Sequence, residues 1–277
     1  MTAATLSSVL RDAMSGGYAV AGLVVLGWED ACAYVEAAEE AGMAIILQAG
    51  PGCRKHTPVA VLGKMFRHLA DQARVPVVCH IDHGYAPEDC LEGIDHGFTS
   101  VMFDGSKLPI AENIEITARI VEKAHAAGVS VEGEVGFVGY AQGAASATTD
   151  PAEAGRFEKE SGADAMAISV GNVHLQTEKT AGIDFKALAA VEAATSIPLV
   201  LHGGSGIPFE TRRKLARETR VSKFNIGTEL RMAFGQALKE NLRQHGEIFD
   251  RLEILKPTIP AVRDTTIQVI QNIGPEA

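Results

Sequence analysis

The chain has 277 residues, of which 46% are hydrophobic and 22% charged, and its formal net charge is −10 at pH 7. This length is typical of one barrel-sized domain, so we expect a single domain over 1–277. The negative charge argues against nucleic acid as a partner, which requires a basic face, but it does not exclude an anionic substrate held by local donors.

Three features of the sequence indicate the cellular compartment of the protein. No apolar run approaches the ~20 residues that span a membrane, so no membrane partner is expected. The first residues, MTAATLSSVLRDAMSGG, are amphipathic and do not resemble a secretory leader. The cysteines lack CxxC spacing and are expected to be reduced thiols. Together these features predict a cytoplasmic protein.

Short apolar runs recur along the chain and predict strands. They are rich in β-branched residues, as expected of parallel strands covered on both faces. The eight runs are Tyr18–Leu26, Ala44–Gln48, Val75–Ile81, Ser100–Phe103, Val129–Val135, Ala165–Val170, Pro198–Leu201 and Val221–Ile226.

Longer stretches with helical spacing separate these runs. The expected helices are Trp28–Ala41, Val59–Arg74, Pro109–Ala127, Pro151–Ser161, Asp184–Thr195 and Pro208–Glu218. The alternation fits either a barrel or a large doubly wound sheet. The GxGxxG fingerprint is absent after the first strand, which favours an α/β fold of the (β/α)₈ TIM-barrel type. The tail Thr228–Ala277 predicts at least two extra C-terminal helices around Pro257.

Polar residues stand where six consecutive strands end. In a barrel these ends share one face, and that face carries the chemistry. The residues are Asp82 and His83, Asp104, Glu132 and Glu134, His174, His202, and Asn225 with Thr228. So many buried polar groups would be costly without a shared purpose, and a bound metal ion supplies one.

Three of these residues suit a catalytic zinc ion. His83, His174 and His202 come from three strand ends, and a three-histidine site with one open position is typical of catalytic Zn²⁺. Asp104 and Glu134 have several interpretations: partners of the histidines, an alternative metal position, or acids paired with barrel lysines. The remaining histidines fall mostly in loops or helices, where a structural or surface role is usual.

Two loops predict a phosphate site. Gly203-Gly204-Ser205-Gly206 follows the seventh strand, and Asn225-Ile226-Gly227-Thr228 follows the eighth. In barrels these loops commonly bind phosphate, because glycine lets backbone N–H groups approach the anion and helix N-termini favour its charge.

The segments HIDHG, MFDGS, EGEVG, VGNVH, LHGGSGIP and FNIGTEL stand in this order over nearly the whole chain. In that order they resemble class II fructose-bisphosphate and tagatose-bisphosphate aldolases. The resemblance implies an aldehyde-lyase that cleaves a phosphorylated ketose by a retro-aldol reaction to dihydroxyacetone phosphate and an aldehyde. It also implies a homodimer or homotetramer.

Site roles also follow from the resemblance. It implies that His83, His174 and His202 bind Zn²⁺ and that Asp82 handles the proton of the C4 hydroxyl. It implies a second or alternative cation site at Asp104 and Glu134. The groups expected to contact substrate and phosphate are Gln48, Gly203, Ser205, Asn225 and Thr228.

The chain departs from the family pattern at several substrate contacts. The loop after the fifth strand reads GFVGYAQGAASATTD and has no carboxylate before Asp150; Tyr140 and Gln142 stand where acids are expected. Leu175 replaces a family glycine, and Val24 stands in place of an amide. We therefore expect a subfamily with an altered substrate.

Several functions remain open from the sequence. One is a fructose or tagatose 1,6-bisphosphate aldolase, and a second is a sister enzyme for another phosphorylated ketose or keto sugar acid. A third is a non-catalytic sugar-phosphate-binding subunit, which the missing loop acids favour and the intact Asp82 and histidines oppose. A fourth is a metal-dependent barrel hydrolase, which the absence of an HxH motif on the first strand opposes.

Overall fold

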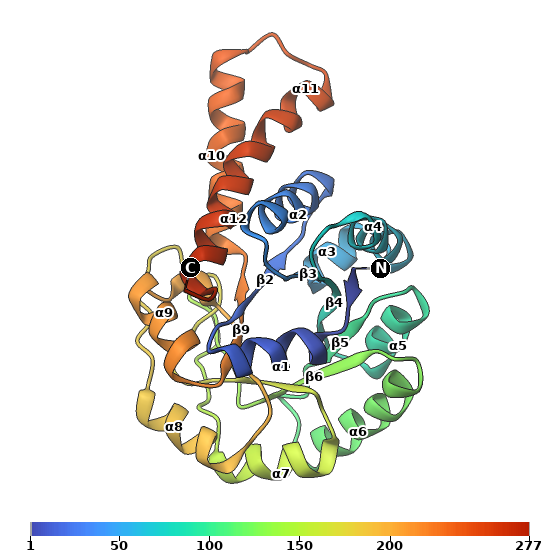
Figure 1. Cartoon of the computed structure of the whole chain (residues 1–277), viewed down its shortest axis with the longest axis vertical. Helices are drawn as coiled ribbons and strands as arrows, with labels where there is room; N and C mark the ends of the chain where they lie inside the picture. The colour runs from blue at the N-terminus through green and yellow to red at the C-terminus, as the bar shows by residue number, and fades with distance from the viewer. Residues whose placement is uncertain (1, 277) are drawn as a thin grey trace.

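The computed structural model describes residues 2–276 and contains a closed parallel barrel (Figure 1). Pairing runs in chain order from β2 to β9, and β9 pairs with β2 to close the ring. The strands are β2 (Val20–Val24), β3 (Ile45–Ala49), β4 (Val77–Gly84), β5 (Ser100–Phe103), β6 (Ser130–Val135), β7 (Ala165–Ile168), β8 (Leu199–Leu201) and β9 (Val221–Ile226). The expected TIM barrel and its eight strands are confirmed.

Helices cover the outside of the barrel (Figure 1). They are α2 (Trp28–Ala41), α4 (Val59–Gln72), α5 (Pro87–Asp95), α6 (Ile110–Ala126), α7 (Pro151–Ser161), α8 (Phe185–Ala194) and α9 (Phe209–Glu218). The sequence pattern had not indicated α5 or the short α3 (Pro51–His56). A local cap stabilises the start of α5: the Asp89 carboxylate accepts hydrogen bonds from the backbone N–H groups of Tyr85 and Ala86.

The N-terminal end of the barrel is closed by the start of the chain. Strand β1 (Ala3–Ala4) pairs with β4, and helix α1 (Leu6–Gly16) lies across the barrel opening (Figure 1). Its apolar face packs against residues near the strand starts, Val20, Ile46, Val78, Met102 and Val200 among them. Among the described residues, the opposite end of the barrel has no such helix packed across its strands.

The barrel interior changes from apolar to polar along the strands. Because side chains alternate along a strand, inward positions two residues apart form successive layers. On β4 these are Val78, His80 and Asp82, and on β6 they are Glu132 and Glu134, all buried. The polar layers therefore lie at the C-terminal ends of the strands, where the sequence predicts the site.

The C-terminal helices extend beyond the ring of helices. They are α10 (Thr228–Gln244), α11 (Arg251–Leu255) and α12 (Ile259–Ile273), with a 3₁₀ turn at Lys256–Thr258 that contains Pro257. Helices α10 and α12 run side by side and carry α11 at their far end (Figure 1). The expected extra helices are confirmed. Among the described residues, no helix is both long and apolar enough to cross a membrane.

Candidate metal centre and active site

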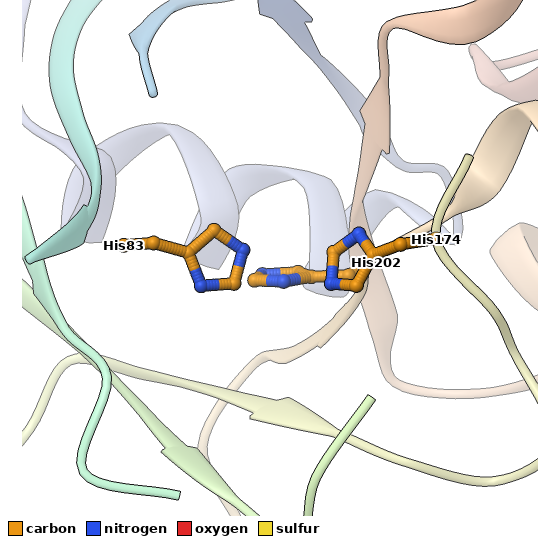
Figure 2. A group of neighbouring side chains, drawn as sticks. All are labelled: His83, His174 and His202. Carbon is orange, nitrogen blue, oxygen red and sulfur yellow. The ribbon is translucent and has the colours of Figure 1, made fainter. Parts of the chain in front are cut away.

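Three histidines meet at the C-terminal mouth of the barrel (Figure 2). His83 ends β4, His174 follows β7, and His202 directly follows β8. Ring centroids are separated by 4.5 Å for His83–His202, 5.3 Å for His83–His174 and 5.4 Å for His174–His202. One ring nitrogen from each lies within 4.8 Å of the others, a spacing that could hold one metal ion.

The backbone at His83 is held in an uncommon conformation. His83 has φ 52°, in the left-handed region that non-glycine residues rarely adopt. The guanidinium of Arg54 donates to the carbonyls of Asp82 and His83 at 2.6 and 2.9 Å, and also to that of Ala49. These bonds from α3 offset the strain and direct the His83 ring toward the other two histidines.

A second group of possible ligands shares His83. Its Nδ1 donates to Asp104 Oδ2 at 2.8 Å, and Glu134 Oε2 lies 3.8 Å away. The three residues form a second group whose ligand atoms lie within 4.8 Å of one another. Burial and the nearby Asp104 raise the pKa of Glu134 to about 8, whereas the hydrogen bond and charge of His83 overcome burial and lower the pKa of Asp104.

Protonation of the histidines matches a metal site. Burial first, and then the neighbouring His83, lower the pKa of His174 to about 4; the same causes hold the pKa of His202 well below its usual value. Neutral imidazoles are the form that binds a metal. Burial would lower the pKa of His83, but Asp82, Asp104 and Glu134 raise it to about 9. The negative surroundings that favour a proton there also favour a cation.

Unsatisfied polar atoms show that the residues fit a metal ion. His202 Nδ1 and Glu134 Oε2 are buried without a hydrogen-bond partner among the described residues. Such orphan atoms are rare in proteins because each one loses its bonds to water. The other nitrogen of His202, Nε2, lies 3.3 Å from Glu132 Oε1. With Nε2 engaged in this way, Nδ1 is free to bind an ion, as in carboxylate–histidine–metal arrangements.

A buried ion pair beneath the histidines had not been assigned a role from the sequence. Lys223 Nζ lies 2.6 Å from Glu132 Oε2, and both side chains are fully buried. His80 Nε2 is 3.4 Å from the same Nζ, while its Nδ1 bonds Ser100 at 2.8 Å. The sequence did indicate that both side chains point into the barrel. Glu132 stands two residues before Glu134 on β6, and Lys223 stands two residues before Asn225 on β9, so each pair faces the same side of its strand.

Asp82 is poised as an ionised carboxylate beside the histidines. Its Oδ1 accepts hydrogen bonds from Gln48 Nε2 at 2.8 Å and Asn225 Nδ2 at 3.0 Å. Burial would raise the pKa of Asp82, but the positive charge of His83 outweighs it and lowers the pKa. A carboxylate held in this way can accept a proton from a substrate hydroxyl.

One cavity of about 270 Å³ joins Asp82, His83 and His174 to the glycine-rich loops, whereas His202 is fully buried behind its wall. Gly203, Ser205, Asn225 and Thr228 line it with Asp82, His83 and His174, so the structure brings together most of the residues selected from the sequence. Gln48, which was expected to contact the substrate, does not line the cavity. Its side chain is fully buried and donates a hydrogen bond to Asp82.

The loops after β8 and β9 are joined through Ser205. Its hydroxyl accepts from the backbone N–H groups of Gly227 and Glu229, each at 3.3 Å. Gly203 has φ 66°, and a Cβ there would lie 2.1 Å from the carbonyl oxygen of Val173, so only glycine fits. Thr228 opens helix α10 at the cavity wall. This cradle of N–H groups and hydroxyls is suited to an anion.

The rest of the cavity wall is less polar. Val24, Leu26 and Leu175 line it together with Tyr85 and Tyr140. Leu175 has φ 59°, so it keeps the left-handed backbone that suits a glycine, and its side chain is 53% exposed at the cavity mouth. An apolar side chain thus stands at the cavity mouth on a backbone conformation that glycine adopts most easily.

Comparison with known proteins points to one family. The model of the family "Fructose-bisphosphate aldolase class-II" matches residues 4–276. The fructose-bisphosphate aldolase of Geobacillus stearothermophilus is 35% identical over 281 residues, covering 99% of this chain and 98% of the relative. The crystal structure of the YdjI aldolase from Escherichia coli K12 superposes with a TM-score of 0.87 at 32% identity, covering 100% of this chain and 99% of the other.

A more distant structure agrees on the fold alone. Fructose-bisphosphate aldolase (Fba) from Campylobacter jejuni has a TM-score of 0.79 at 22% identity, with 97% of this chain and 93% of that chain covered. The fold of nearly the whole chain is therefore shared with a protein of low sequence identity.

Removal of one histidine tests the metal centre. We expect His202→Ala to weaken binding of a divalent metal by more than about 100-fold, since loss of an outer partner alone costs about 10–100-fold. Metal content after dialysis against a graded chelator, read by mass spectrometry, measures this. His245→Ala, at an exposed position after α10, is the matched control and should keep its metal. Equal retention by both variants would contradict the assignment.

Proposed function

The chain belongs to the class II fructose-bisphosphate aldolase family, and from this premise we propose its substrate, its metal and the roles of its residues. It is an aldehyde-lyase that performs retro-aldol cleavage, in a family that depends on a metal. We propose that it cleaves a phosphorylated ketose of the fructose or tagatose 1,6-bisphosphate type to dihydroxyacetone phosphate and an aldehyde. The observation that carries this proposal is the single cavity that Asp82, His83, His174 and the anion cradle line together.

The proposed cofactor is one Zn²⁺ ion held by His83, His174 and His202. Three neutral imidazoles with an open position are the usual ligand set of catalytic zinc. When bound, this ion acts as a Lewis acid that stabilises negative charge on the ketose oxygens. His83, Asp104 and Glu134 form the proposed second or alternative cation site.

Asp82 is the proposed catalytic base. Its carboxylate accepts the proton of the C4 hydroxyl as the bond between C3 and C4 breaks. Gln48 and Asn225 keep the carboxylate oriented, because both donate to the same oxygen and leave Oδ2 for the substrate. This chemistry needs no Schiff-base lysine, and Lys223, the nearest candidate, is engaged with Glu132.

The proposed phosphate site is the cradle between the β8 and β9 loops. Gly203, Ser205, Asn225 and Thr228 surround one part of the cavity, and the first turn of α10 adds the positive end of a helix dipole. A phosphate bound there places the adjoining carbonyl and hydroxyl of the ketose near the three histidines.

We further propose a cytoplasmic homo-oligomer, either a dimer or a tetramer. Support comes from the exposed apolar side chains on the C-terminal helices and the segment between α10 and α11: Phe249 is 93% exposed and Leu252 71%. Exposed apolar side chains that gather on one part of the surface, here the part that extends beyond the barrel, are typical of a contact between subunits. A second copy of the chain is the proposed partner, through α10, α11 and α12.

A sister aldolase is the second candidate function. Val24, Leu26 and Leu175 make part of the cavity wall apolar, which favours a ketose or keto sugar acid that differs from the common bisphosphates away from its phosphate. Both candidates share the retro-aldol chemistry and differ only in the part of the substrate that faces this wall.

Cleavage of fructose 1,6-bisphosphate by the purified protein tests the proposed function. We expect triose phosphate release that EDTA abolishes and added Zn²⁺ restores, because the ion stabilises the developing charge. A zinc-loaded protein that releases none would favour the sister aldolase. Aldehyde release from other phosphorylated ketoses would then identify the substrate.

Replacement of the proposed base separates chemistry from metal binding. We expect Asp82→Ala to retain zinc but to lower kcat by about 10²-fold or more, the usual contribution of a general base. Steady-state kinetics and metal analysis of the same preparation measure both. Asp71→Ala, at a surface ion pair with Arg67, is the control. Near-normal turnover by Asp82→Ala would assign the base elsewhere.

The phosphate cradle predicts a change in affinity. We expect Ser205→Ala to raise KM for a phosphorylated ketose by about 10-fold, with a smaller effect on kcat, since a lost hydrogen bond to a charged group costs about 1.5–3 kcal/mol. Ser8→Ala, exposed in α1, provides the comparison. An unchanged KM would place the phosphate in another part of the cavity.

A further inference from the structure

Retro-aldol cleavage leaves a proton to be delivered that Asp82 does not supply. When the bond between C3 and C4 breaks, its electron pair stays on the ketose fragment as an enediolate. Asp82 takes the C4 hydroxyl proton, and the aldehyde leaves. To become dihydroxyacetone phosphate, the enediolate must accept a proton on carbon C3. A second group in the cavity is therefore required.

The side chains around the cavity leave few candidates. The titratable groups that line it are Cys53, Asp82, His83, Tyr85, Tyr140, His174 and Arg231. Asp82 is already used, and the two histidines are proposed metal ligands. Arg231 does not release its proton in proteins, and burial raises the pKa of the Cys53 thiol, which makes it a poorer proton donor. Two phenols remain, those of Tyr85 and Tyr140.

Tyr140 is the phenol held against the metal centre. Its ring stacks on that of His174, with centroids 4.9 Å apart and planes at 25°. The backbone fixes this contact: His174 N–H donates to the carbonyl of Gly139 at 2.8 Å, and Ala141 N–H donates to that of His174 at 3.0 Å. A side chain held in this way by two neighbours of its own loop is positioned before substrate arrives.

The loop that carries Tyr140 is closed on itself. Phe137 and Ala147 pair through both of their N–H groups, and Gly139 N–H donates to Ser146 Oγ at 2.9 Å. Ser146 Oγ also lies 3.4 Å from the carbonyl of Asn172, which ties the loop to the segment after β7. No Asp, Glu, Lys or His occurs from Phe137 to Thr149, so Tyr140 is the proton donor this loop offers.

We infer that the Tyr140 hydroxyl transfers the proton between the enzyme and carbon C3 of the enediolate, which makes Tyr140 a catalytic residue of this chain. The inference rests on the proposed function. In the cleavage direction a C3–H bond forms, the Tyr140 O–H bond breaks, and its electron pair remains on the phenolate. Tyr140 is 36% exposed, so the phenolate regains a proton from water. Synthesis runs the same steps in reverse.

Tyr85 is the competing donor and fits less well. Its ring stands beside His83 at a centroid distance of 6.1 Å, farther than the ring of Tyr140 is from His174. Tyr85 is also 52% exposed, against 36% for Tyr140, so its ring is covered less by the residues around the cavity.

The test uses the half-reaction on dihydroxyacetone phosphate alone. The zinc-loaded wild type is expected to exchange a C3 hydrogen of this compound with deuterium from D₂O, followed by NMR. Tyr140→Phe keeps the ring that stacks on His174 and should slow exchange by about 10²-fold. Zinc content and the Kd for dihydroxyacetone phosphate should change less than about threefold. Tyr140→Phe that exchanges at the wild-type rate would overturn the inference.

Two further variants separate catalysis from loop structure. Thr148→Ala alters an exposed position of the same loop outside the site cavity and should exchange at the wild-type rate. If Thr148→Ala slowed exchange as much as Tyr140→Phe, the effect would be structural and the inference wrong. A larger loss in Tyr85→Phe than in Tyr140→Phe would also overturn it.

The deuterium experiment also distinguishes this inference from the proposed function. A zinc-loaded wild type that binds dihydroxyacetone phosphate without any exchange would overturn the proposed function, and the Tyr140 assignment with it. Exchange by the wild type that is unaffected in Tyr140→Phe would overturn the Tyr140 assignment alone. A trapping measurement adds a direct readout: during cleavage of fructose 1,6-bisphosphate, hexacyanoferrate(III) should oxidise more enediolate per turnover in Tyr140→Phe, because its protonation is delayed.

Discussion

The proposed active site depends on one buried ion pair, Lys223 with Glu132, which links β9 to β6 across the barrel interior. A buried charge costs several kcal/mol unless a partner and hydrogen bonds compensate it, so neither side chain is tolerable there without the other. Lys223 occupies one oxygen of Glu132, and the second oxygen lies 3.3 Å from His202 Nε2. The pair thereby fixes both the ring orientation and the tautomer of His202. Its Nδ1 is left facing the other two histidines, and the geometry of the metal centre follows from that.

Compensation of buried charge also explains the pKa values of the acids and the histidine at the barrel mouth. Asp82 and Asp104 have lowered pKa values, while that of Glu134 is raised to about 8 and that of His83 to about 9. Protons on Glu134 and His83 thus supply the positive charge that the clustered carboxylates require. A divalent cation satisfies the same requirement and also engages the orphan atoms His202 Nδ1 and Glu134 Oε2. A barrel mouth that gathers these carboxylates around three imidazoles, two of which have lowered pKa values, therefore favours a cation.

The sequence predicted the parts of this structure that follow from local pattern. All eight barrel strands and the boundaries of α2 were recoverable, because short β-branched runs and glycine caps are local signals. The histidines were found because each stands at a strand end or in the loop that follows a strand. Helix α5 was missed because it is only nine residues long and follows β4 after a two-residue connection. The Lys223–Glu132 pair was missed for another reason: it joins positions 91 residues apart, and no local pattern reports which inward residues of β6 and β9 meet.

The proposed metal ligands and phosphate cradle lie at strand ends and in the loops that follow β7, β8 and β9. Leu175, Tyr140 and Val24, where the sequence departs from the expected family pattern, line another part of the cavity wall. A side chain there can differ while hydrogen bonds hold the backbone beside it. Leu175 illustrates this: its left-handed conformation costs about 1–2 kcal/mol for a non-glycine residue, yet the hydrogen bonds of His174 with Gly139 and Ala141 hold the adjacent backbone in place. The wall can therefore select a different aldehyde half, and its loop can provide a phenol instead of a carboxylate, while the cleavage chemistry at Asp82 and the histidines is preserved.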